Sequence, residues 1–174
     1  EEMQRLVTLI NDLLNFSRYQ SGQQKLERVP CDPAALLEQA RQRFQPSAAQ
    51  NGIEIKLELQ TPLPSLLLDQ QQMDRTLDNL LSNALRHTPD GGEIRLLARH
   101  HGERVILSVE DNGEGIPYSQ QARIFEPFVQ IGRRRGGAGL GLALCKEIAQ
   151  LHGGRIGVHS RIGHGTIFYI ALPI

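Results

Sequence analysis

Two asparagines four residues apart, Asn79 and Asn83, are the first residues in this sequence that could carry chemistry. Residues at this spacing in a helix lie on one face, so both amides are expected to point to the same side. An amide oxygen suits Mg²⁺, which keeps several waters and shares its other positions with phosphate oxygens. Arg86 and His87 follow within a turn and could reach those phosphates. Solvated asparagines on a surface helix are the alternative for this segment alone.

A second candidate is Asp111, which ends an alternating apolar stretch and begins Asp-Asn-Gly113-Glu-Gly115. A carboxylate accepts a hydrogen bond from the exocyclic amine of adenine and not from the carbonyl of guanine. Gly113 and Gly115 lack Cβ, so a flat base could lie against the backbone. A hairpin turn is the alternative. It is disfavoured because the apolar Ile116 and a proline follow in place of a second strand.

A third motif contains Gly137, Gly139, Leu140, Gly141 and Leu142 and leads into a predicted helix. Glycines there expose backbone N–H groups at a helix start, which favours phosphate oxygens. A loop rather than a strand precedes them, so a dinucleotide-binding fingerprint is not indicated, and no Gly-Lys-Ser/Thr marks a P-loop. Together, the three motifs predict a pocket for a purine nucleotide with a divalent cation.

The irregular stretch 126–138 precedes these glycines and is long enough to suggest a functional lid. Arg133 within it could contact phosphate, with a solvated loop tip as the alternative. Phe128 is a candidate nucleotide contact, although with Phe125 it is expected chiefly to pack the base of the lid. Near the end of the chain, the hydroxyl of Thr166 could reach the edge of the nucleotide.

The elements that would position these residues follow from periodicity, caps and turn residues. Helices are expected at 3–20, 33–50, 70–87 and 140–152, and strands at 53–59, 66–68, 93–99, 104–111, 155–160 and 166–172. This order fits an α+β fold with helices on one face of a mixed, mostly antiparallel sheet. The helix at 3–20 carries a wide apolar face that one helix cannot bury alone, formed by Met3, Leu6, Val7, Ile10, Leu13, Leu14 and Ser17 and widened by Leu9 and Phe16.

Bulk composition excludes some classes of function. The 174 residues carry zero formal net charge, so no global electrostatic attraction to nucleic acid is expected. The two cysteines, Cys31 and Cys145, lack metal-ligand spacing and are expected to be reduced, although a disulfide is possible. No stretch is apolar enough to span a bilayer, no signal peptide is visible, and the chain reads as a fragment of a longer protein.

The ordered motifs resemble the catalytic and ATP-binding domain of sensor histidine kinases, within the superfamily of gyrase, Hsp90 and MutL ATPases. The resemblance covers residues 26–174, and its motifs are the N box at 79–88, glycine boxes at 111–116, 137–142 and 163–166, and the F box at 124–128. It implies a two-layer α/β sandwich with the Bergerat ATP-binding fold. Residues 1–25 then resemble the second helix of the dimerisation and phosphoacceptor hairpin with its linker.

The resemblance also implies roles. Asn83 would bind Mg²⁺, Asp111 would read adenine, and 126–138 would be the ATP lid. The catalytic set would be Asn79, Arg86 and Arg133. Partners would be ATP, the acceptor hairpin, a response-regulator receiver domain and a second subunit, in a cytoplasmic domain of a bacterial inner-membrane sensor.

One departure bears on activity. None of the six histidines has the family's acceptor context, an acidic residue next and a proline four further on, so no autophosphorylation by this chain alone is expected. The relatives that hydrolyse ATP resemble one another in having a glutamate that activates water, and Asn79 occupies the corresponding position in this chain. An amide cannot act as a general base, which favours transfer to histidine. An ATP-binding module that controls a partner protein is the alternative function, and a degenerate, non-binding domain is a further one.

Overall fold

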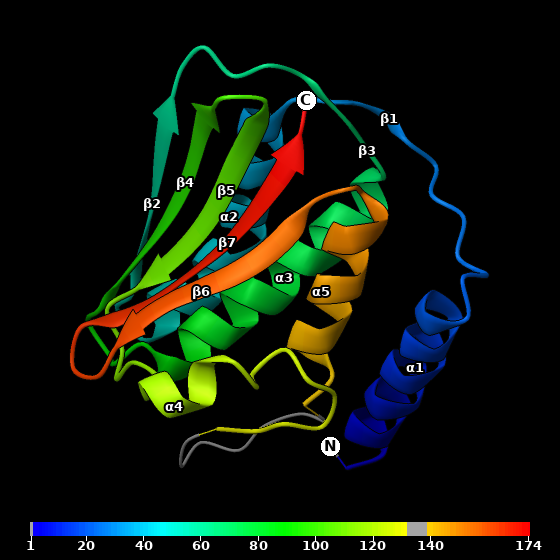
Figure 1. The fold of residues 1–174 in the computed structure, drawn as a ribbon. Coiled ribbons are helices and arrows are strands. Elements are labelled where there is room, and N and C mark those ends of the chain that lie inside the picture. Colours follow the sequence, from blue (N-terminus) through cyan, green and yellow to red (C-terminus); the bar gives the residue numbers. More distant parts are fainter. Residues whose placement is uncertain (1, 132–138) are drawn as a thin grey trace.

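The computed structural model describes residues 2–131 and 139–174, and Figure 1 shows them as a sheet with helices packed on one face. The elements in chain order are α1 (Glu2–Gln20), β1 (Val29–Cys31), α2 (Pro33–Gln50), β2 (Glu54–Gln60), β3 (Leu66–Leu68), α3 (Gln70–His87), β4 (Glu93–His101), β5 (Arg104–Asp111), α4 (Tyr118–Gln121), α5 (Gly141–Leu151), β6 (Arg155–Arg161) and β7 (Gly165–Pro173). The predicted α+β sandwich is confirmed.

The main sheet has five strands in the order β2-β4-β5-β7-β6. Strands β2 and β4 are parallel, and the other neighbours are antiparallel. β1 and β3 form a separate antiparallel pair. The mixed, mostly antiparallel sheet expected from the sequence is therefore present.

The start of α3, which carries the asparagines, is fixed by side-chain caps. Asp69 Oδ1 accepts a hydrogen bond from the N–H of Gln72 at 3.1 Å, as an N-cap aspartate should. The N–H of Asp69 itself donates to Nε2 of the buried His152 at 3.0 Å. His152 Nδ1 lies 2.8 Å from the carbonyl oxygen of Ile148, and burial lowers the pKa of His152. This histidine is structural and joins the end of α5 to the start of α3.

The core lies between the inner face of the sheet and helices α2, α3 and α5. Alternate residues of β4, β5 and β7 point inward and are buried, as the two-residue period of a strand requires. On the helical side, the packed face of α3 consists of Met73, Leu77, Leu80, Leu81 and Ala84. These layers hold α3 across the strands whose ends carry Asp111 and Thr166. Cys31 and Cys145 are both buried as free thiols, so the expectation of reduced cysteines is confirmed.

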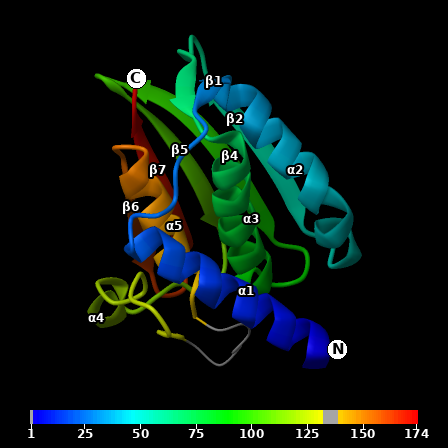
Figure 2. The ribbon, with the colours of Figure 1, turned by 90° about the vertical axis from the view of Figure 1, so that its right-hand side faces the viewer.

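Helix α1 lies outside this sandwich and packs on α5, as Figure 2 shows. Its buried side chains are Phe16, beside Leu140 and Ala143, and Tyr19, beside Leu144 and Ile148. Two polar contacts tie it to α3: Asp12 to Arg75 at 2.8 Å, and the Tyr19 hydroxyl to the side chain of Gln72.

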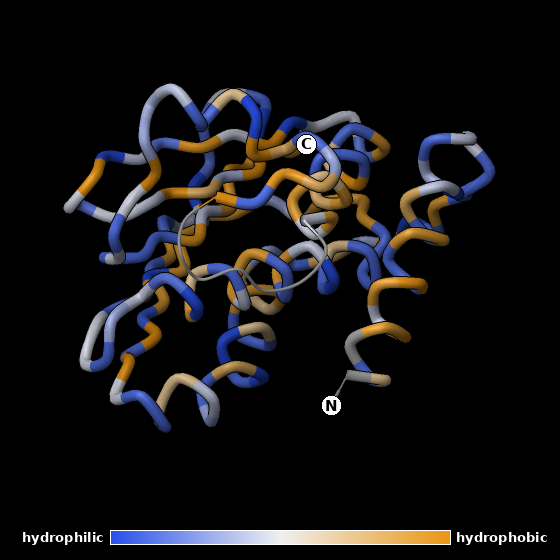
Figure 3. Tube along the Cα trace, turned by 90° about the horizontal axis from the view of Figure 1, so that it is seen from below, coloured by the Kyte–Doolittle hydropathy of each residue, from blue (hydrophilic) through white to orange (hydrophobic). Residues whose placement is uncertain are grey.

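The apolar face predicted for α1 is only slightly used in these contacts. Met3, Leu6, Val7, Leu9, Ile10, Leu13 and Leu14 are all exposed, while Phe16 is buried. Orange turns of α1 in Figure 3 stand apart from the sandwich. The expectation that this face needs a partner therefore stands. Among the helices of residues 2–131 and 139–174, none combines the length and apolarity needed to cross a membrane.

Candidate functional site

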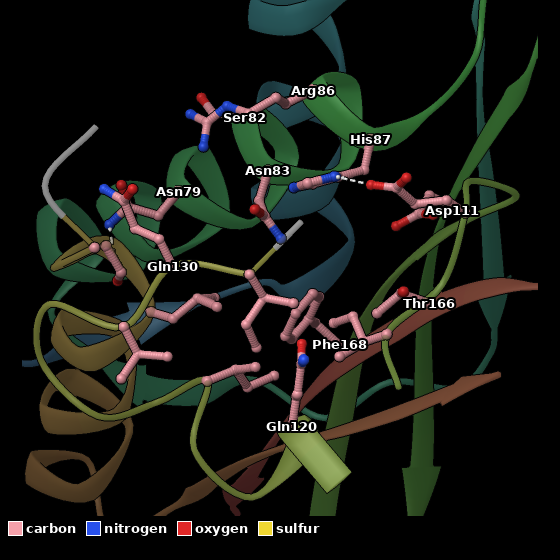
Figure 4. Close-up of a pocket in the computed structure, with 18 of the residues that line it drawn as sticks. Asn79, Ser82, Asn83, Arg86, His87, Asp111, Gln120, Gln130, Thr166 and Phe168 are labelled. Atoms are coloured by element: carbon pink, nitrogen blue, oxygen red, sulfur yellow. Dashed lines mark hydrogen bonds and ion pairs between the residues drawn. The ribbon is translucent and has the colours of Figure 1, made fainter. Parts of the chain in front are cut away.

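A cleft of about 690 Å³ opens where α3 faces the ends of β5 and β7 (Figure 4). Its size is within the range of small-molecule sites. The predicted site residues that line it are Asn79, Asn83, Arg86, His87, Asp111, Gly115, Ile116, Gly139, Gly141, Leu142 and Thr166. The structure thus brings together residues from all three sequence motifs.

One wall is the polar face of α3. Asn79, Asn83, Arg86 and His87 all line the cleft, because spacings of three, four and seven or eight residues return to the same side of a helix. His87 Nδ1 lies 3.1 Å from a carboxylate oxygen of Glu114 in the glycine-rich loop. This contact bridges the end of α3 to the loop that follows β5.

Asp111 and Thr166 form the opposite wall as neighbours in the sheet. They are register partners on β5 and β7, so their side chains project from the same face. Asp111 Oδ1 accepts a hydrogen bond from the N–H of Gly113 at 2.9 Å. Burial raises the pKa of Asp111, and this effect is opposed by the N–H groups of Gly113 and Thr166 and by nearby His87. Asp111 is therefore a half-buried acceptor held ready for a donor.

The glycines after Asp111 are required by close backbone contacts. A Cβ on Gly113 would lie 2.3 Å from the carbonyl oxygen of His87, and one on Gly115 would lie 2.2 Å from that of Arg161. Gly115 also has φ = +77°, which side chains rarely adopt. These glycines allow the loop to sit between the end of α3 and β6. Gly115 lines the cleft, whereas Gly113 is buried and does not line it.

The third motif places the start of α5 beside the asparagines. Asn79 Nδ2 donates to the carbonyl oxygen of Gly141 at 3.5 Å, and Gly139 and Gly141 both line the cleft. The N-terminus of an eleven-residue helix thus faces the α3 wall, which favours anionic groups there. Leu140 is buried against Phe16 of α1 and does not line the cleft.

Besides Gly113 and Leu140, which were predicted to contact the nucleotide but do not line the cleft, three more predicted residues are not seen in the site. Phe128 is 64% exposed with φ = +65° and is not among the lining residues, while its N–H donates to the carbonyl oxygen of Gly139 at 2.9 Å. Phe125 packs on the core and meets Phe168 edge-on, with ring centroids 6.1 Å apart. Arg133 and Gly137 lie outside the described residues.

The structure also shows lining residues that sequence reasoning missed. Thr8 and Asp12 come from α1, Gln120 comes from α4, and Ile162 comes from the turn between β6 and β7. Thr8 and Asp12 are four residues apart, a spacing that places both on one face of a helix and indicates a polar stripe on α1. No pattern in the sequence, however, indicated that this stripe would face the cleft.

Comparisons with known proteins agree with this geometry. Residues 68–174 match the family model described as histidine kinase-, DNA gyrase B-, and HSP90-like ATPase. The chain is 63% identical over 174 residues to the alginate biosynthesis sensor protein KinB of Pseudomonas aeruginosa, covering 100% of this chain and 29% of that protein.

Two solved structures extend the comparison. Full-length ShkA in complex with AMPPNP has a TM-score of 0.89 at 37% identity, covering 97% of this chain and 35% of that one. Histidine kinase ThkA in complex with the response regulator protein TrrA has a TM-score of 0.81 at 25% identity, covering 99% of this chain and 48% of that one. The chain therefore spans less than half the length of these relatives.

Proposed function

The chain belongs to the family of histidine kinase-, DNA gyrase B- and HSP90-like ATPases, and from this premise we propose that it is the ATP-binding catalytic domain of a sensor histidine kinase. In this role it transfers the γ-phosphate of ATP to a histidine on a hairpin helix outside this chain. The observation that carries the proposal is the meeting, in one cleft, of Asp111 with the asparagine face of α3 and the start of α5.

Adenine recognition is assigned to the Asp111 end of the cleft. The ionised carboxylate accepts from the exocyclic amine, and its fixed contact with the Gly113 N–H orients it before the nucleotide arrives. Ile116, Leu142 and Phe168 supply the apolar surface against which a base can pack. A base with a carbonyl in place of the amine would make no hydrogen bond there, because its carbonyl oxygen and the Asp111 carboxylate are both acceptors.

Phosphate binding is assigned to the α5 end. Arg86 and His87 on α3, the backbone at Gly139 and Gly141, and Arg133 and Gly137 from the lid region are the candidate contacts. Within the described residues, no three His, Cys, Asp or Glu side chains group into a metal site. The donors present suit Mg²⁺ held by the Asn83 amide oxygen together with phosphate oxygens and water. When bound, Mg²⁺ would neutralise phosphate charge during transfer.

Transfer to histidine rather than to water is proposed from the chemistry of Asn79. Its amide cannot take a proton from water, so hydrolysis lacks a general base at that position. An imidazole is already a nucleophile and needs no such activation. The chain's share of the reaction is then positioning and electrostatic stabilisation of the transferred group.

Helix α1 is proposed to be the second helix of the dimerisation and phosphoacceptor hairpin, with residues 26–174 as the catalytic domain. The exposed face defined above, from Met3 to Leu14, supports this role because it would be buried in a helical bundle of two subunits. The proposed partners are accordingly the acceptor hairpin and a receiver domain of a response regulator. A location on the cytoplasmic side, where ATP is present, is part of the same proposal.

Phosphate transfer in a longer version of the protein that carries the acceptor helix tests this function. We expect γ-labelled ATP to leave an acid-labile label on the protein, because the N–P bond of phosphohistidine breaks in acid. Asp111→Asn should abolish the label, and Asp90→Asn, the same change at an exposed residue outside the cleft, should not. Nucleotide binding without any label would favour the regulatory-module alternative.

A further inference from the structure

Ser160 lies at the end of a row of three polar side chains that crosses the sheet beside the proposed adenine site. Asp111 on β5 is the register partner of Thr166 on β7, and Thr166 is the register partner of Ser160 on β6. All three therefore project from the same face of the sheet. Asp111 and Thr166 line the nucleotide cleft, while Ser160 lies behind Thr166.

Every hydrogen-bonding position of the Ser160 hydroxyl is occupied. Its oxygen lies 2.8 Å from the carbonyl oxygen of Gly165, 2.8 Å from the backbone nitrogen of Ile116 and 2.9 Å from Oγ1 of Thr166. A serine hydroxyl has one proton to donate and two lone pairs to accept with. The carbonyl of Gly165 can only accept, and the N–H of Ile116 can only donate.

These constraints fix the direction of the remaining bond. The single proton of Ser160 goes to the Gly165 carbonyl, and one lone pair receives the Ile116 N–H. The other lone pair must then receive the proton of Thr166. Because Thr166 has no second proton, its oxygen presents only lone pairs to the cleft.

We propose that Ser160 is a specificity-determining positioning residue, which holds the Thr166 hydroxyl as an acceptor and so makes the base-facing wall accept from an amine and reject a carbonyl. An exocyclic amine offers two N–H groups to the two acceptors, Asp111 and Thr166, directly or through water. A carbonyl offers none. Without Ser160, the Thr166 hydroxyl is free to turn its proton into the cleft and donate to a carbonyl.

Calorimetric titration with ADP and with inosine diphosphate, which carries a carbonyl at the position of the amine, tests this inference. The quantity measured is the ratio of the Kd for inosine diphosphate to the Kd for ADP. In Ser160→Ala we expect this ratio to fall about fivefold, the equivalent of one neutral hydrogen bond. Ser160→Thr, which keeps the hydroxyl, should retain the native ratio.

Two further variants separate specificity from loop packing. Gln121 Nε2 donates to the carbonyl oxygens of Ile116 and Ser160, each at 2.9 Å, so Gln121→Ala loosens the same loop without touching the proton chain. We expect Gln121→Ala to weaken the binding of ADP and of inosine diphosphate alike and to leave the ratio of the two Kd values unchanged. In a Thr166→Val background, Ser160→Ala should no longer change the ratio, because the residue through which Ser160 acts is gone.

The inference rests on the proposed function, and the outcomes distinguish the two. If the native chain binds neither nucleotide, both the proposed function and this inference are overturned. If it binds ADP and Ser160→Ala keeps the native ratio, the inference alone is overturned. Should Ser160→Ala fail to fold, Thr166→Val is compared with Thr166→Ser. A native ratio in Thr166→Val would then overturn the inference.

Discussion

Replacing Gly165 by alanine should damage the fold and the nucleotide site together, whereas the same change at Gly163 should cost only backbone strain. Both glycines have positive φ, +90° at Gly165 and +78° at Gly163. A Cβ on Gly165 would lie 1.9 Å from the carbonyl oxygen of Asp111, but a Cβ on Gly163 would meet nothing within 4 Å. The two residues therefore form a matched pair within one turn.

The magnitudes follow from these contacts. The left-handed conformation costs a residue with a Cβ about 1–2 kcal/mol, and this applies to both variants. Overpacking adds about 1–3 kcal/mol for Gly165→Ala alone, because the contact is with backbone. For a chain of this size, each kcal/mol of difference corresponds to roughly 2–4 °C in Tm.

Urea denaturation and ADP calorimetry on both variants test this expectation. Gly165→Ala should be less stable than Gly163→Ala and should bind ADP more weakly, because relieving the contact moves Asp111. Gly163→Ala should bind ADP as the native chain does. Equal stability and equal affinity in the two variants would refute the reasoning that Gly165 is required by its approach to Asp111.

Three other predictions concern the cleft and α1. Burial raises the pKa of Asp111, so the ionised carboxylate destabilises the fold as pH rises through that pKa. Asp111→Asn should therefore increase the free energy of unfolding at pH 8, and this gain should vanish below pH 3.8, the ordinary pKa of an aspartate. Denaturation curves that show the opposite pH trend would count against the burial argument. Asn79→Glu should raise slow ATP hydrolysis, up to about 100-fold, by supplying a general base, and unchanged phosphate release would leave the role of Asn79 unsupported. Phe16→Ala should weaken the docking of α1 by about 3 kcal/mol and speed amide exchange there, while Leu13→Ala, at a side chain 44% exposed, should not; equal exchange in the two would contradict the packing described.

Local signals were sufficient to predict much of the fold. The Asp69 cap and Pro89, two residues after His87, predicted the bounds that α3 has, Gln70–His87. Asp32 before Pro33 marked the start of α2 in the same way. Alternation of apolar residues predicted β5 and its end at Asp111. These features depend on neighbours in the sequence, so the sequence carries them directly.

Features that depend on tertiary contacts were not predictable in the same way. Periodicity showed that α1 has a wide apolar face, but not that Phe16 would be buried on α5 while Leu6 and Leu13 stay exposed. The role of Ser160 required the register of three strands, which no local pattern gives. Gly113 and Gly115 were predicted to let a base lie against the backbone, but Gly113 does not line the cleft, and the close approach of both to the His87 and Arg161 carbonyls was visible only in the fold.

Calorimetric titration of the native chain with AMPPNP, with and without Mg²⁺, beside Asp111→Asn and Asp90→Asn, tests the central claim most directly. The account predicts binding that Mg²⁺ strengthens, that Asp111→Asn weakens about tenfold or more through loss of a charged hydrogen bond, and that Asp90→Asn leaves unchanged. Absence of binding by the native chain, or equal binding by Asp111→Asn, would contradict the assignment of this cleft as an adenine-nucleotide site.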